Sequence, residues 1–281
     1  MKLLVTGSSG YIGRFITADA KRRGDEIVHL TRSEPKTSQW LPFDLAAPPS
    51  SLPAADALIH CAFDHVPGRY RGGEGDDPER FLKRNLEGSV KLFKAAREAG
   101  VPRIVFLSSR AVYDGHPATT VLTEDLPLNP SSLYGQMKWD VEQALNRLDV
   151  IGTSLRATGI YGQPTPNSDH KWSQLFADFE TGKTIEPRAG TELHGEDLVA
   201  AIRLVLSLPK EQVAHQAFNI SDIVVDRHDL LKAYREHHDL DRPLPDAVST
   251  LDKAEMDCSN LKTLGWTPRG WQGLNEFVRS L

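Results

Sequence analysis

The chain has 281 residues, of which 40% are hydrophobic and 25% charged, and its 33 basic and 38 acidic side chains give a net charge of −5. This composition is that of a globular protein, and the acidic balance argues against nucleic acid or an anionic membrane surface as a partner. No apolar run approaches the roughly 20 residues that cross a bilayer, and the short apolar run at the N-terminus predicts no signal peptide. Two distant cysteines, Cys61 and Cys258, exclude a disulfide scaffold, so a cytoplasmic protein is expected.

The first thirty residues predict a strand, a glycine-rich turn, a helix and a second strand. Residues 2–6 and 26–30 are short apolar runs of the kind that form buried strands. Between them, apolar side chains recur at helical spacing, and Gly24 is placed where a helix would end. The segment is therefore one compact strand–turn–helix–strand unit.

The turn has the spacing Gly-x-x-Gly-x-x-Gly. It reads Gly7-Ser8-Ser9-Gly10-Tyr11-Ile12-Gly13. Glycines let the backbone turn sharply and approach a pyrophosphate, and the free N–H groups of the following helix favour negative charge. The preceding strand and the following helix supply the context that this motif needs to bind a dinucleotide. The alternative is a purely structural strand–helix turn.

The residues after the second strand distinguish NAD from NADP. An acidic residue there would accept a hydrogen bond from the ribose 2′-hydroxyl of NAD, whereas an arginine would pair with the 2′-phosphate of NADP. This chain has Thr31 followed by Arg32, and Arg14 at the helix start could assist. The pattern favours NADP as the cofactor. In the alternative, Arg32 is solvated and Glu34 binds the ribose of NAD.

Strands and helices continue to alternate through the first 160 residues. Further strands are expected at 40–43, 54–62, 103–107 and 150–155, and helices at 78–99 and from 131. This alternation predicts an α/β fold, a Rossmann-type doubly wound parallel sheet over residues 1–160. Residues 161–281 are more irregular and predict a smaller C-terminal substrate-binding lobe, with some elements at about 196–222 packing back on the first domain. Within the lobe, helices are expected at 172–181, 196–208 and 227–238, and an isolated strand at 218–220.

Three polar residues are predicted to form the catalytic site. Ser109 follows the strand at 103–107, and Tyr134 and Lys138 are four residues apart, so they share one face of the next helix. A nearby ammonium favours the phenolate, so Tyr134 could exchange a proton with a substrate hydroxyl. Ser109 would hydrogen-bond the developing oxyanion, and Lys138 could hold the nicotinamide ribose. The alternative is a surface Tyr and Lys on an amphipathic helix.

The sequence resembles the extended short-chain dehydrogenase/reductase family, the relatives of NAD-dependent epimerases and dehydratases, over nearly its whole length. The motifs that carry the resemblance are the glycine turn, Asp44-Leu45, His60-Cys61-Ala62, Asn85-Leu86-Glu87-Gly88, Ser108-Ser109-Arg110-Ala111-Val112-Tyr113, Tyr134-Gly135-Gln136-Met137-Lys138, Leu155-Arg156, Tyr161-Gly162, His194-Gly195-Glu196-Asp197-Leu198 and Leu264-Gly265-Trp266-Thr267-Pro268. The resemblance implies a homodimer that forms through helices near 79–99 and 132–147.

The resemblance also implies cofactor contacts beyond the glycine turn. Asp44 and Leu45 would lie near adenine, Cys61 and Ala62 would line the cofactor, and Asn85 would sit near the nicotinamide. Together with the residues argued above, the predicted cofactor-binding set is Gly7, Ser9, Gly10, Tyr11, Ile12, Gly13, Thr31, Arg32, Asp44, Leu45, Cys61, Ala62, Asn85, Tyr134 and Lys138. No His, Cys or carboxylate cluster has metal-ligand spacing, so no metal is expected.

Departures from the family pattern narrow the expected activity. Dehydratases of this family resemble one another in an Asp-Glu pair after the catalytic Ser or Thr, where this chain has Arg110 and Ala111, so dehydration is not expected. Nucleotide-sugar members usually have Asn at the position of Gly159 and an Arg in the stretch that here reads Gly190-Thr191-Glu192-Leu193. Both differences weaken the case for a diphosphate-linked sugar.

Two groups of polar residues are candidates for substrate binding. They are Asp64, His65, Arg69 and Arg71 in one loop, and His170, Lys171 and Arg188 in the C-terminal lobe. Their basic members would suit a carboxylate or phosphate on the substrate, or they are simply solvated.

These features predict an NAD(P)-dependent oxidoreductase or epimerase that acts on a secondary alcohol or carbonyl of a small, sugar-like substrate, with Tyr134 as acid/base. Net redox chemistry and epimerisation use the same residues, and a preference for NADP favours a net reductase. Two alternatives stay open: a nucleotide-sugar 4-epimerase with retained NAD, and a non-catalytic NADP-binding regulator.

Overall fold

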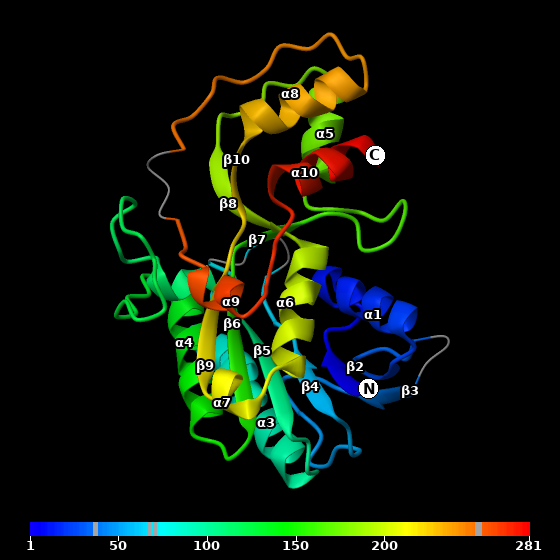
Figure 1. The fold of residues 1–281 in the computed structure, drawn as a ribbon, viewed down its shortest axis with the longest axis vertical. Helices are drawn as coiled ribbons and strands as arrows, with labels where there is room; N and C mark the ends of the chain where they lie inside the picture. Colours follow the sequence, from blue (N-terminus) through cyan, green and yellow to red (C-terminus); the bar gives the residue numbers. More distant parts are fainter. Residues whose placement is uncertain (36–38, 67–68, 70–71, 251–254) are drawn as a thin grey trace.

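The computed structural model describes residues 1–35, 39–66, 69, 72–250 and 255–281. Its centre is a seven-stranded sheet in the order β3-β2-β1-β4-β5-β6-β9, in which every pair of neighbours is parallel (Figure 1). The strands are β1 (Lys2–Thr6), β2 (Glu26–Thr31), β3 (Gln39–Pro42), β4 (Ala57–His60), β5 (Arg103–Ser109), β6 (Ile151–Ala157) and β9 (Gln216–Ile220). The predicted doubly wound parallel sheet is confirmed.

Helices cover both faces of this sheet and make two separate apolar cores. On one face lie α1 (Tyr11–Arg23) and α6 (Gly195–Ser207). On the other lie α4 (Leu133–Asn146) and a long helical segment made of α2 (Pro78–Leu82), the π-helical turn η1 (Lys83–Glu87) and α3 (Gly88–Glu98). The near-continuous burial of β4 and β5 follows from this double cover.

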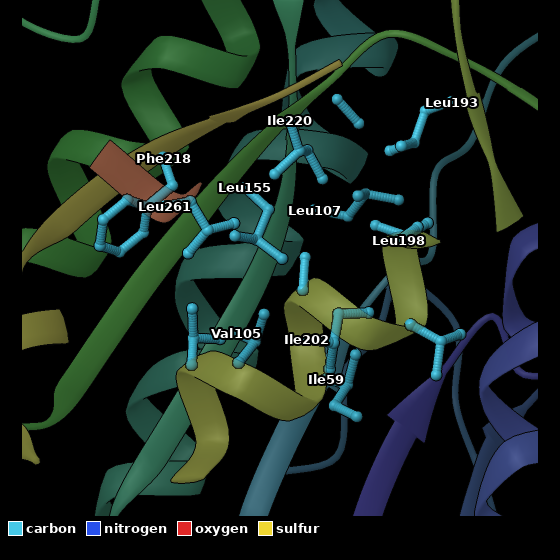
Figure 2. Packing of buried hydrophobic residues seen from close by; sticks show 14 of the residues in the cluster. Ile59, Val105, Leu107, Leu155, Leu193, Leu198, Ile202, Phe218, Ile220 and Leu261 are labelled. Atoms are coloured by element: carbon cyan, nitrogen blue, oxygen red, sulfur yellow. The ribbon is translucent and has the colours of Figure 1, made fainter. Parts of the chain in front are cut away.

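Figure 2 shows how α6 packs on the sheet. Leu198 and Ile202 are four residues apart, so they project from one face of the helix onto side chains of the central strands. Those side chains are Ile59, Val105, Leu107 and Leu155, and Phe218 and Ile220 of the edge strand β9 belong to the same cluster. This packing attaches the start of α6 firmly to the carboxyl ends of the strands.

Residues 218–220 are not the isolated strand that the sequence predicted. They belong to β9, which pairs with β6 in the register Leu155↔Phe218 and forms the last strand of the large sheet. The chain thus leaves the sheet after β6, enters the lobe, and returns through α6 and α7 (Lys210–Val213). Edge pairing over such a sequence distance cannot be read from a local apolar pattern.

The remaining elements form a smaller lobe above the carboxyl end of the sheet (Figure 1). Its three-stranded sheet has the order β10-β8-β7 and was not predicted from the sequence. The strands are β7 (Gly159–Tyr161), β8 (Ala189–His194) and β10 (Ile223–Asp226), and the helices are α5 (Ser173–Glu180), α8 (Arg227–His237) and α10 (Gly270–Arg279). Aromatic pairs such as Phe176 stacked on Tyr234 fill its core. The short helix α9 (Ser259–Thr263) packs against β9.

Among the described residues, no helix combines the length and apolarity needed to cross a bilayer.

Candidate active site

A cavity of about 990 Å³ lies where the carboxyl ends of the sheet strands face the lobe. Its walls come from the β1–α1 turn, the ends of β2, β4, β5 and β6, the start of α4, and the β7–β8 edge of the lobe. Ligands of open parallel sheets bind at this end, because the turns there supply free backbone groups. The cavity is therefore the candidate active site.

The glycine turn is built for close approach of a ligand. Gly7 has a φ of +64°, and a Cβ there would lie 3.0 Å from Ala62 N, while a Cβ at Gly13 would collide with the Gly7 carbonyl. The N-cap residue of α1, Gly10, makes no side-chain cap, so the first N–H groups of the helix face the cavity without a competing side chain. The turn residues of the predicted cofactor set line the cavity, and their geometry fits a dinucleotide pyrophosphate.

Two arginines, Arg14 and Arg32, line the cavity. Thr31 is buried and donates its hydroxyl to the Ser33 carbonyl (2.8 Å), so no acidic acceptor stands at the end of β2. Arg32 is exposed and lines the cavity, as do Asp44 and Leu45. Arg14 also lines it, and its Nε is buried and has no hydrogen-bond partner within the part of the chain that the structure describes.

Thr6 and His60 fix the end of β4. The Thr6 hydroxyl accepts from the N–H groups of Cys61 and Ala62 (3.1 Å each) and donates to His60 Nδ1 (2.7 Å). Ser89 donates to a backbone carbonyl, so it accepts from His60 Nε2–H (2.8 Å), which assigns the tautomer of the imidazole. Burial lowers the pKa of His60 to about 3 and raises that of Cys61 to about 12. Both side chains are structural supports for the cofactor wall.

Asn85 is the one member of the predicted cofactor set that does not line the cavity. It is 2% exposed and lies in the π-helical turn η1, behind the loop that follows β4. Its amide donates to the carbonyls of Asp64 (2.8 Å) and Phe81 (3.0 Å), and its oxygen accepts from Asp64 N–H (2.8 Å). Asn85 therefore holds the loop that forms the wall of the cavity.

Ser109, Tyr134 and Lys138 all line the cavity. Ser109 ends β5 and accepts a hydrogen bond from Ala111 N–H (3.1 Å), which starts the short helix η2 (Arg110–Tyr113). Helix α4 begins after Ser132, whose hydroxyl accepts from Gly135 N–H, so the tyrosine lies in its first turn. A Cβ at Gly135 would collide with the carbonyl of Ala111, so this glycine permits the close contact of α4 with η2.

Lys138 is a buried cation with an apolar surround. Its Nζ donates to the Leu107 carbonyl (2.7 Å) and lies 4.7 Å from the ring centroid of Phe106, 5.4 Å from that of Phe63 and 5.8 Å from that of Tyr134. Burial lowers its pKa from 10.5 to about 8. The ammonium is therefore held beside the phenol ring by ring faces and one carbonyl.

The lowered pKa of Lys138 predicts a pH-dependent stability that a Lys138→Met variant lacks. Between about pH 8 and pH 10.5 the unfolded chain binds more protons at this lysine than the folded protein does, so the folded state gains stability as pH rises. From about pH 7.5 to about pH 9.5 the wild-type free energy of unfolding should rise by about 2 kcal/mol relative to that of the variant. Urea unfolding without cofactor measures both curves, and parallel curves would contradict the prediction.

A buried polar network lies behind the catalytic residues and was not predicted from the sequence. Arg156 of β6 pairs with Glu142 of α4 (Nη2–Oε2 2.8 Å), and Glu142 also accepts from the hydroxyl of Ser108. Arg156 donates to the Tyr113 hydroxyl, which in turn donates to Asn219 Oδ1 (3.1 Å). The network joins β5, β6, β9 and α4 directly beneath the site.

The predicted substrate-binding residues are brought together only in part. Asp64, His65, His170, Lys171 and Arg188 line the cavity. Asp64 pairs with Arg84 (3.1 Å). Arg69 is exposed and does not line the cavity, and Arg71 lies outside the described residues.

Glu192 also lines the cavity, and the sequence did not predict it as a site residue. In the sequence, an isolated carboxylate between small and apolar residues of a short strand is the feature that could have pointed to Glu192. The structure pairs it with Lys171, twenty-one residues earlier in the chain.

The fold and the site define a short-chain dehydrogenase/reductase of the extended type, with a glycine-rich dinucleotide turn and a Ser–Tyr–Lys group at the strand ends. The chain matches the NAD dependent epimerase/dehydratase family over residues 3–221, well over half of its length, and it belongs to that family.

Similar proteins agree with this assignment. The chain is 34% identical over 163 residues to the UDP-glucose 4-epimerase of Bacillus subtilis, an alignment covering 53% of this chain and 48% of that protein. It is 24% identical over 314 residues to the UDP-glucose 4-epimerase of Lactobacillus helveticus, an alignment that covers 96% of this chain and 92% of that protein. Several of the curated relatives are thus matched over only about half of their length.

Solved structures share the whole fold. MoeE5 in complex with UDP-glucuronic acid and NAD has a TM-score of 0.80 and 25% identity, covering 100% of this chain and 97% of that one. UDP-glucuronic acid 4-epimerase from Bacillus cereus, in complex with UDP-glucuronic acid and NAD, has a TM-score of 0.80 and 19% identity, and the match covers 100% of this chain and 97% of that one.

Proposed function

We propose that the protein is an NADP-preferring oxidoreductase that acts on a secondary alcohol, or the corresponding carbonyl, of a sugar-like substrate. The observation that carries the proposal is the single cavity shared by the glycine turn and by Ser109, Tyr134 and Lys138. When bound, the nicotinamide accepts or returns a hydride at the substrate carbon. Family membership and the NAD-containing structures of relatives support this chemistry.

The three residues divide the remaining work. Tyr134 takes the hydroxyl proton during oxidation and returns it during reduction. Ser109 donates a hydrogen bond to the oxygen on which negative charge develops, because β5 presents its hydroxyl at the cavity wall. Lys138 stabilises the phenolate from within an apolar surround, where electrostatic attraction is stronger than in water. The residues after Ser109 are Arg110 and a buried Ala111, so no carboxylic acid stands there to assist loss of water.

The preference for NADP rests on Arg14 and Arg32. Both line the adenosine end of the cavity, and the Nε of Arg14 is buried without a hydrogen-bond partner in the described part of the chain. Glu34, which would serve NAD in the alternative, is exposed and does not line the cavity. A 2′-phosphate satisfies this arrangement better than a hydroxyl.

An Arg32→Ala variant should bind NADP⁺ about 10- to 100-fold more weakly, because one charge-assisted contact is lost, and should bind NAD⁺ as the wild type does. Isothermal titration calorimetry with both cofactors measures the change. Glu34→Ala is the matched control, with neither affinity altered. Tighter wild-type binding of NAD⁺ than of NADP⁺, weakened by Glu34→Ala, would overturn the assignment.

The overall reaction is tested by a turnover screen with each cofactor over free sugars, uronic acids, simple aldehydes and nucleotide sugars. A steady change in reduced-nicotinamide absorbance with a sugar-like substrate supports the proposed net oxidoreductase. Inversion of a substrate carbon by NMR, without a change in absorbance, would replace it with an epimerase. Cofactor binding with neither signal would favour the regulator.

We propose further that the protein forms a homodimer through α3 and α4. These helices pack side by side on one face, and Leu82 and Leu86 on the helical segment leading into α3 are only partly buried. Sedimentation velocity tests this proposal, and a monomer at micromolar concentration would reject it.

A further inference from the structure

The substrate end of the cavity contains an ion pair that the catalytic residues do not use. Lys171 donates to both carboxylate oxygens of Glu192. The Glu192 side chain is 9% exposed and that of Lys171 is 33% exposed, and both line the cavity. Burial raises the pKa of Glu192 above its ordinary value, while Lys171 opposes this effect. An ion pair so placed gains little over an apolar pair in stability, so its position in the wall calls for another explanation.

The glycine at position 159 makes room for this pair. Gly159 of β7 lies directly opposite Glu192 of β8. A Cβ at Gly159 would collide with Lys171 Nζ and would lie 2.6 Å from Glu192 Oε2. The Lys171–Glu192 pair therefore fills the space into which any longer side chain at 159 would project.

The Lys171–Glu192 pair stands close to the catalytic residues. Ser109 of β5 is paired in register with Ala157 of β6, and Gly159 follows two residues later. Two residues span at most about 7 Å of backbone. Ser109 and the ion pair therefore line one cavity from adjoining parts of the fold.

The charged side chains that the lobe contributes to the cavity balance one another. Among the described residues from 158 to 192 that line it, Lys171 and Arg188 are balanced by Asp169 and Glu192. Burial lowers the pKa of His170, so it adds no charge near neutral pH. Within the lobe, this balance favours an uncharged group over the diphosphate or carboxylate that the sequence suggested.

We propose that the Lys171–Glu192 pair determines specificity for a free, uncharged monosaccharide, one that carries no nucleotide. The carboxylate has lone pairs left to accept from two adjacent hydroxyl groups, and the ammonium has a donor left for a third oxygen. A water-excluded wall strengthens these charge-assisted bonds. The inference rests on the proposed function and gives its substrate class.

Binding to the cofactor-loaded protein tests the inference independently of turnover. The protein is saturated with whichever of NADP⁺ and NAD⁺ binds more tightly, and calorimetry measures D-glucose, D-galactose, D-mannose, D-xylose, D-glucuronate and UDP-glucose. At least one neutral sugar should bind more tightly than both D-glucuronate and UDP-glucose. Tighter binding of either charged compound than of every neutral sugar, or no binding of any neutral sugar, would overturn the inference.

Variants then test the pair itself. Glu192→Gln and Lys171→Met should each raise the dissociation constant of the preferred sugar at least about tenfold and leave that of the cofactor unchanged. Gly159→Ala should have the same effect with both charged residues intact, because the added Cβ displaces them. Lys183→Met, which breaks the exposed Lys183–Asp178 pair on the same lobe, is the matched control and should change nothing. Sugar affinity unchanged in Glu192→Gln, with an unaltered urea midpoint, contradicts the assignment.

The two proposals fail separately. If a neutral sugar binds and the variants weaken that binding, but no turnover is seen, the role of the Lys171–Glu192 pair is supported and the oxidoreductase activity is rejected. If the protein turns over UDP-glucose but binds no free sugar, the oxidoreductase activity is supported and the proposed role of the Lys171–Glu192 pair is rejected.

Discussion

Tyr134→Phe should reduce turnover by about 10²- to 10⁴-fold, the usual contribution of a positioned acid or base. The substitution removes only the hydroxyl, so the ring keeps its contact with Phe63 (centroids 5.1 Å apart) and its place beside Lys138. The affinity for the cofactor should therefore stay the same. Steady-state kinetics on the substrate found in the screen, together with calorimetry of the cofactor, separate the two effects.

Tyr161→Phe is the matched control for this prediction. Tyr161 is buried in the lobe, does not line the cavity, and its hydroxyl has no hydrogen-bond partner in the described part of the chain. Removing that hydroxyl should leave kcat unchanged. If Tyr134→Phe keeps more than about a tenth of the wild-type turnover, proton transfer by this tyrosine is excluded as the main role.

Glu142→Ala should lower the free energy of unfolding by about 3–5 kcal/mol, because it leaves the Arg156 guanidinium buried without its partner. The two side chains are only 2% and 7% exposed, so water cannot replace the lost carboxylate. The hydroxyl of Ser108 loses its acceptor as well, next to the catalytic Ser109. Urea unfolding at neutral pH measures the loss, and kcat should fall with it because the end of β5 is released.

Two further variants distinguish a desolvated charge from a general loss of packing. The double variant Glu142→Leu/Arg156→Met removes both charges and should recover more than half of the lost stability. Asp178→Ala breaks an exposed pair, in which Lys183 is 63% exposed, and should cost less than about 1 kcal/mol. A double variant as unstable as Glu142→Ala would show that the pair stabilises the fold by its attraction and not merely by avoiding an unpaired charge.

The candidate site and much of the first domain could be predicted because their signals are local. The glycine turn and the helix that follows it depend on backbone conformations that few residues allow. Gly24, which ends this helix with a φ of 74°, is one such residue. Tyr134 and Lys138 share a helical face through their spacing alone. In a parallel sheet, residues at strand ends meet at one edge, so Ser109 could be assigned to the same cavity from the order of elements.

The contacts of Asn85 could not be predicted from the sequence. The resemblance implies a place near the nicotinamide, and the structure puts the residue in a π-helical turn whose side chain bonds to the backbone of the loop that follows β4. Nothing in the surrounding residues signals a π-turn, because it inserts one residue into a helix without changing the apolar pattern visibly. The direction of a side chain after such an insertion is decided by its neighbours in space.

By itself, the sequence determined the class of fold, the dinucleotide turn and the Ser109–Tyr134–Lys138 group, because each depends on backbone propensity or on spacing within one element. Tertiary structure alone decided the rest. It added β9 to the large sheet beside β6, formed a second sheet from β7, β8 and β10, and set Lys171 against Glu192 across the space left by Gly159. These contacts join segments far apart in the chain, and their energies depend on burial and on charges that approach one another only in the folded chain.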